Sequence, residues 1–170
     1  MRRPLLLPAA AALALGACAH AGSKRAEAEP PAIEVTNPIR HAVSRITYAP
    51  GFAGADLASA FEQLFCNRLF NLNKHQAICA DEVQAYIEAK RQAAMLSGAG
   101  ESVEALYASL DAPRRVDLSA TQTGEDVAIT LIVQDRGGAT LGRLQVVVKK
   151  DGSDLPQRAN EAAIEVLKLK

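Results

Sequence analysis

Apolar residues recur every three or four positions in four stretches of the chain, which is the spacing of one face of an α-helix. In the longest stretch, Leu57, Phe61 and Leu64 begin such a face. Asp81 and Ser102 are of the type that caps a helix start, and Pro113 is a helix breaker. The sequence therefore predicts four helices, over residues 54–72, 81–96, 102–110 and 155–169.

Apolar and polar residues alternate between the third and fourth predicted helices, and alternation is typical of a half-buried strand. Three such strands follow one another, separated by glycine-containing turns at residues 123–126 and 135–138. This spacing predicts an antiparallel meander. Two shorter strand candidates precede it, and the first of them, residues 43–49, is rich in β-branched residues. The predicted strands cover residues 43–49, 76–79, 115–122, 127–133 and 140–149.

The order of these elements is strand, helix, strand, two helices, three strands and a final helix. Such an order predicts an α/β (α+β) fold, in which a mixed sheet ends in an antiparallel C-terminal meander. We expect the helices to cover one face of this sheet, in a two-layer or three-layer sandwich. The core has no Trp, so its bulky members are expected to be Phe61, Phe65 and Phe70.

The N-terminus has the anatomy of a signal peptide. Arg2 and Arg3 precede an apolar run of eleven residues, from Leu5 to Leu15, and two small residues follow. The run is too short for a spanning helix, which needs about 20 apolar residues. Residues 15–18, Leu-Gly-Ala-Cys, resemble the lipobox of bacterial lipoproteins.

This resemblance implies cleavage before Cys18 and acylation of its thiol and new amino group with palmitate-type chains, which would anchor the protein in a membrane outside the cytoplasm. By similarity to lipoprotein sorting in enterobacteria, Ala19 after Cys18 favours the outer membrane, facing the periplasm. The alternative is cleavage near Ala12-Leu13-Ala14, which would give a soluble secreted protein. Residues 1–17 are therefore interpreted as a signal peptide, 18–40 as a flexible tether and 41–170 as a single domain.

Charge excludes one class of partner. The mature chain would keep all 19 acidic residues and lose two of the 19 basic ones, so its formal charge is −2. Nucleic-acid binding needs a basic face, and this balance does not supply one. The expected partners are a membrane, through the lipid anchor, and an envelope protein.

Cys66 and Cys79 remain after Cys18, and an oxidising compartment permits a disulfide between them. Such a bridge would add about 3 kcal/mol by restricting the unfolded chain. The alternative is a pair of separate buried thiols. No Cys-x-x-Cys or His-x-x-x-His spacing supports a metal site, and we expect no cofactor.

No catalytic motif stands out. The three histidines, His20, His41 and His75, are scattered, and the usual serine or zinc hydrolase signatures are missing from the sequence. Arg114-Arg115 is a possible ligand clamp, although a solvated turn is the simpler interpretation. The glycine-rich segments at 98–102 and 137–142 are interpreted as turns because neither has the order of elements that a phosphate-binding loop requires. We therefore expect no enzyme.

Residues 80–98 and 102–148 resemble the amino-terminal domain of TolB and its relatives, and the similarity covers roughly residues 43–167. Those relatives include CsgG-like curli-secretion lipoproteins, the flagellar lipoprotein FlgO and the penicillin-binding-protein activator lipoproteins. The resemblance implies a binding or scaffolding domain in the cell envelope and implies no catalytic residue. The membrane-inserting hairpins of the CsgG-like proteins are not evident here.

The sequence thus predicts a non-catalytic envelope lipoprotein that acts as a protein-binding or scaffolding module for wall synthesis, secretion or motility machinery. Its partner surface is unknown, although the exposed edge of the meander is the best candidate. Val146-Val147-Val148 belongs to that sheet, and its default interpretation is buried core. The alternatives are a periplasmic small-molecule or glycan-binding lipoprotein and a secreted hydrolase on an atypical scaffold.

The cysteine interpretation predicts the outcome of a thiol assay. Mature protein purified without reductant and then denatured should show no titratable thiol, because Cys18 is acylated and the other two cysteines are bridged. Two titratable thiols in this oxidised material would contradict the bridge.

Overall fold

The structure is a computed structural model, and it describes residues 35–98 and 102–169. It confirms the predicted order of elements and the mixed α+β class. The predicted signal peptide, Cys18 and most of the predicted tether lie outside the described residues. The helices are α1 (Ala55–Leu72), α2 (Ala80–Ser97), α3 (Val103–Ala108) and α4 (Leu155–Lys168), and the strands are β1 (His41–Val43), β2 (Ala77–Ile78), β3 (Arg114–Thr123), β4 (Asp126–Asp135) and β5 (Thr140–Val148).

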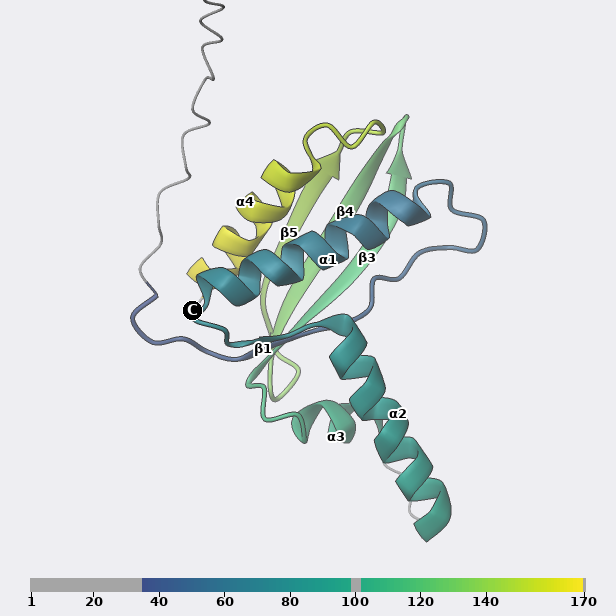
Figure 1. Ribbon diagram of the computed structural model, residues 1–170, viewed down its shortest axis with the longest axis vertical. Helices are drawn as coiled ribbons and strands as arrows, with labels where there is room; N and C mark the ends of the chain where they lie inside the picture. Colours follow the sequence, from purple (N-terminus) through teal and green to yellow (C-terminus); the bar gives the residue numbers. More distant parts are fainter. Residues whose placement is uncertain (1–34, 99–101, 170) are drawn as a thin grey trace, which may run out of the picture. The chain divides into compact units, whose positions relative to one another are not determined.

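Within the described residues, five strands form one sheet in the order β2-β1-β3-β4-β5 (Figure 1). β1 runs parallel to both β2 and β3, whereas β3, β4 and β5 form the predicted antiparallel meander. Parallel neighbours need a crossover connection, and α1 supplies it between β1 and β2. No helix in residues 35–98 or 102–169 is long and apolar enough to cross a bilayer.

α1 and α4 lie side by side on one face of the meander (Figure 1). Cross-strand neighbours such as Leu118, Leu131 and Leu144 face them, and Phe61 and Phe65 of α1 are completely buried against this sheet. Removing this apolar surface from water is the main stabilising term of the fold. The buried face of α4 consists mostly of small residues, namely Ala159, Ala162, Ala163 and Val166.

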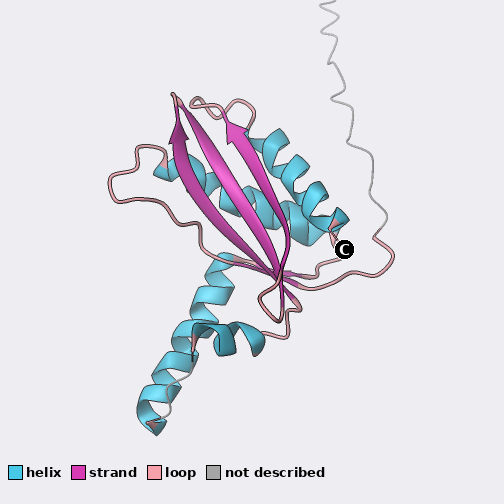
Figure 2. Ribbon diagram, turned by 180° about the vertical axis from the view of Figure 1, so that it is seen from behind, coloured by secondary structure: helices cyan, strands magenta, loops and turns pink. Residues whose placement is uncertain are grey.

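α2 and α3 pack on the opposite face, next to β1. Adjacent strand residues point to opposite sides of a sheet, and Val43 joins the core under α1 while Ala42 joins a second cluster with Val83 and Leu106. The expectation that the helices share one face is therefore wrong. Figure 2 shows the outer face of the antiparallel strands without a helix over it.

Cys66 and Cys79 are joined by a disulfide with a Cα–Cα distance of 5.7 Å. Cys66 lies on the buried side of α1, and Cys79 is the N-cap of α2, where its backbone N–H donates to the Glu82 carboxylate at 3.2 Å. The cap expected at Asp81 is thus two residues earlier. Asp81 instead forms an ion pair with Arg45.

The strand predicted over residues 43–49 is shorter and begins earlier, at His41. The N–H groups of Ser44 and Thr47 still donate to β3 carbonyls at 2.9 and 3.0 Å. Between them, the N–H of Ile46 donates to the buried carboxylate of Glu62 on α1. The segment therefore follows β3 without the regular hydrogen bonding of a strand.

Phe70 is not a core residue. Its side chain is 38% exposed and stacks on the His75 ring with 4.7 Å between ring centroids. Leu69, one position earlier on α1, occupies the buried position.

This difference between two phenylalanines of one helix can be measured. Phe65→Ala should lower the free energy of unfolding by about 3–5 kcal/mol, because it leaves a cavity among fully buried neighbours. Phe70→Ala should cost about 1 kcal/mol or less. Urea denaturation of both variants tests this, and equal losses would contradict the burial described here.

Candidate functional site

The outer edge of β5 is the long unpaired strand edge in the described part of the chain. β5 has nine residues and, of the described strands, pairs only with β4. β2, at the other end of the sheet, has two residues. An exposed strand edge offers unpaired backbone donors and acceptors to another strand.

The hydrogen bonds of β3 identify which β5 backbone groups are unpaired. The carbonyls of Val116 and Leu118 accept from the segment beside β1, so the backbone groups of these residues point away from β4. In antiparallel pairs, hydrogen-bonded and non-hydrogen-bonded positions alternate. Carried through the β3–β4 and β4–β5 registers, this alternation directs the N–H and C=O groups of Arg143, Gln145 and Val147 to the free edge.

α4 forms the second wall of a groove along this edge, with a volume of about 370 Å³. The charges on this wall are paired on α4 itself: Arg158 with Asp154 and Glu161 at 3.3 and 3.0 Å, and Glu165 with Lys168 at 2.6 Å. The residues that line the groove are Leu144, Gln145, Val146, Val147, Arg158, Glu161, Ala162 and Glu165.

The three valines at the end of β5 do not share one environment. Val148 is fully buried and Val146 packs against the same core, whereas Val147 is 41% exposed on the outer face. The interpretation of all three as core therefore fails for Val147, because strand residues alternate between faces.

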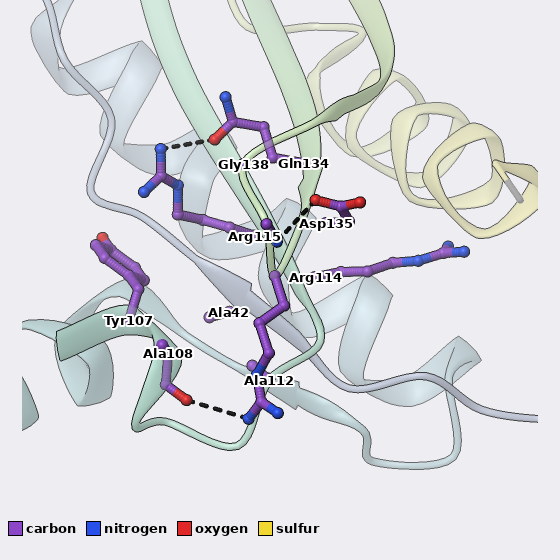
Figure 3. A pocket seen from close by; sticks show the side chains of 11 residues that line it. Ala42, Tyr107, Ala108, Ala112, Arg114, Arg115, Gln134, Asp135 and Gly138 are labelled. Carbon is purple, nitrogen blue, oxygen red and sulfur yellow. Dashed lines mark hydrogen bonds between the residues drawn. The ribbon is translucent and has the colours of Figure 1, made fainter. Parts of the chain in front are cut away.

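A second concave site lies between α3, the start of β3 and the β4–β5 turn, with a volume of about 110 Å³ (Figure 3). Its floor includes Ala42 and Ala112, and the Tyr107 ring forms one wall. The Arg115 guanidinium lies 4.9 Å from the centre of that ring and donates to Gln134 at 2.6 Å.

Arg114 and Arg115 do not form a clamp, because they are consecutive strand residues and diverge. Figure 3 shows the Arg114 side chain pointing away from Tyr107 and Arg115. Arg114 donates to the Leu169 carbonyl at 2.7 Å, near the end of α4. Arg115 is paired with Asp117 on the other face.

The two described histidines, His41 and His75, lie in different environments. His41 is 1% exposed, and its Nδ1 lies 3.3 Å from the Asn73 side-chain nitrogen. Its Nε2 has no hydrogen-bond partner in the described structure. Burial and the nearby Arg114 charge lower the pKa of His41 to about 4, against a smaller opposing effect of the Ile39 carbonyl. His75 stacks on Phe70, and His20 lies outside the described residues.

The other candidate residues have structural roles. Ser102 caps α3, with its hydroxyl accepting from the Ala105 N–H at 3.2 Å, and residues 137–138 form the β4–β5 turn. Residues 99–101 of the first glycine-rich segment lie outside the described residues. Across residues 35–98 and 102–169, no group of three or more His, Cys, Asp or Glu side chains is arranged to hold a metal ion.

Among known proteins, the matches to this chain are solved structures. No known protein family matches the chain, and neither does any curated protein. A variant of the PelC dodecamer from Paraburkholderia phytofirmans is 16% identical over 76% of this chain and 86% of that chain, with a TM-score of 0.45. A second PelC dodecamer structure from the same organism is 16% identical over 81% and 90%, with a TM-score of 0.40.

TolB from Acinetobacter baumannii is 11% identical over 77% of this chain, with a TM-score of 0.43, and the match takes up 28% of the TolB chain. With identities and TM-scores this low, none of these structures supports an argument about the fold, activity or partners of this chain.

Sequence reasoning identified the meander edge but not the helix beside it. The sequence feature that points to this helix face is a row of polar residues on α4, namely Arg158, Glu161 and Glu165, which are spaced three and four apart around Ala162. That row shows a solvent-facing stripe, but its position next to β5 depends on how α4 packs.

The buried imidazole predicts how stability changes with pH. As pH falls from about 6.5 to 4, the unfolded chain takes up a proton at His41 and the folded chain does not, so about 3 kcal/mol of unfolding free energy is lost. Urea denaturation at a series of pH values measures this slope. His41→Gln should have a flatter slope over that range, and an unchanged slope would contradict the assignment.

Proposed function

We propose that this protein is a non-catalytic, lipid-anchored module of the bacterial cell envelope that binds a protein partner along the free edge of β5. The lipobox-like residues 15–18 support the anchor and the compartment. The unpaired backbone groups of Arg143, Gln145 and Val147, beside the groove under α4, support the mode of binding.

The geometry of this edge defines the chemistry of the partner segment. An extended segment that pairs with β5 gains main-chain hydrogen bonds, and its alternate side chains fall on the two faces of the sheet. On one side they meet Ala162 and the paired charges of α4, and on the other they lie beside Val147. A partner segment fits this edge when the residues that it places on each of the two faces are small or apolar.

Absence of catalysis is part of the proposal. His41 is neutral and buried, and its neighbour is an amide rather than a hydroxyl or a thiol. An accessory role in wall synthesis, secretion or motility machinery fits a tethered module that contributes binding and no chemistry.

The pocket beside Tyr107 favours a second candidate function, the binding of a small polar ligand such as a sugar. It combines an aromatic wall, apolar floor residues and hydrogen-bonding groups from Arg115 and Gln134, which is the usual composition of small-ligand sites. A sugar that shifts the NMR signals of Tyr107 and Gln134, together with a partner-free β5 edge, would favour this function.

A proline at the β5 edge separates strand addition from other binding modes. Gln145→Pro removes an N–H that points to the free edge and leaves the β4 ladder intact, whereas Gln145→Thr keeps the N–H. In crosslinking and pull-down from native envelopes, Gln145→Pro should lower partner recovery about tenfold or more relative to wild type and Gln145→Thr.

The purified complex provides the second measurement. Hydrogen exchange at Arg143, Gln145 and Val147 should slow when the partner is bound, because their amides become hydrogen-bonded. Partner recovery that is equal in all three proteins, with unchanged exchange at these amides, would exclude the β5 edge as the binding surface.

A further inference from the structure

The distal half of α2 carries the two most exposed large apolar side chains of the described structure. Leu96 is 91% exposed and Met95 is 82% exposed, and they are neighbours in the last turn of the helix. None of residues 88–96 is buried. In Figure 1 this part of α2 runs away from the sheet, beyond its contacts with β1 and α3.

Basic side chains lie one turn behind this apolar tip. Arg91 is four residues before Met95 and so lies on the same side of the helix. Lys90 is next to it, 5.6 Å from the centre of the Tyr86 ring. With Glu88, the exposed half of α2 has two basic residues and one acidic residue. This order suits a helix end at a lipid surface, because the apolar side chains can enter the interface while the long basic side chains extend to the headgroups.

We infer that the α2 tip inserts Met95 and Leu96 into the interface of the bilayer that holds the lipid anchor. This inference rests on the anchor at Cys18 that is part of the proposed function. Sixteen residues lie between Cys18 and Val35, the first described residue, so the predicted tether spans at most about 60 Å when fully extended. α2, with 18 residues, is about 27 Å long. The tip is therefore within reach of the same membrane.

The tether makes membrane binding by so small a contact favourable. Two side chains offer little apolar area, and a free domain would bind vesicles weakly. Once the chain is anchored, insertion becomes an intramolecular step at high effective concentration. The depth is limited to the interface, because the carbonyl groups of the last turn still need hydrogen-bond partners. The contact would give the domain a fixed orientation at the surface, with Arg91 at the level of the headgroups.

The chain has no Trp, so one introduced Trp is an unambiguous reporter. The chain starting at Cys18 is coupled through that thiol to a maleimide phospholipid in phosphatidylethanolamine and phosphatidylglycerol vesicles. Leu96→Trp should then show a blue-shifted emission and be quenched several-fold more by brominated lipid than Gln84→Trp, an exposed control earlier on α2. Met95→Asp in the Leu96→Trp chain should abolish the difference.

Equal, weak quenching of the two reporters on anchored protein would overturn the inference. A blue shift of Leu96→Trp that grows with protein concentration and needs no vesicles would also overturn it, and would assign the tip to contact with a second copy. Because the anchor is coupled chemically, neither result depends on acylation in the cell. Mass spectrometry of native protein tests that part of the proposed function separately.

Discussion

The buried carboxylate of Glu62 fixes the path of the chain between β1 and α1. It accepts hydrogen bonds from the Ile46 N–H and from Arg45, which also pairs with Asp81 at the start of α2. Burial raises the pKa of Glu62, while the Ile46 N–H and the Arg45 charge oppose that rise. A buried carboxylate is costly without such partners. These contacts therefore connect the segment that contains Arg45 and Ile46 to α1 and α2.

This constraint decides which strand edge is free. Because Ile46 is held by α1, the residues around it remain beside β3, where Thr47 accepts from the Ala120 N–H at 2.8 Å. The edge of β3 beyond the end of β1 is thus occupied. The mixed sheet is short and covered by helices where it is parallel, and long and open on one face where it is antiparallel. That division is typical of the two kinds of sheet.

The fold could be predicted from the sequence to the extent that local patterns determine it. Helical spacing located α1–α4 and period-two spacing located β3–β5, because the burial of one face determines which positions of an element are apolar. Two features depend on tertiary contacts and cannot be inferred from these spacings: the interruption at Ile46 and the placement of α2 and α3 on the opposite face. The exposure of Phe70 does follow from the helical spacing, because the step of four from Phe65 ends at Leu69. One wall of the candidate site could be predicted, since a meander must have an edge strand. The other wall could not, because the position of α4 beside β5 depends on tertiary packing.

The disulfide between Cys66 and Cys79 has a mechanical consequence. It joins a buried turn of α1 to the N-cap residue of α2, across a sequence separation of 13 that includes the two-residue strand β2. A force applied at the far end of α2 is therefore transmitted through a covalent bond into the helix that carries the main core. The short β1–β2 pairing bears little of that force. The N-terminal end of α2 therefore stays attached to α1 for as long as the disulfide is intact.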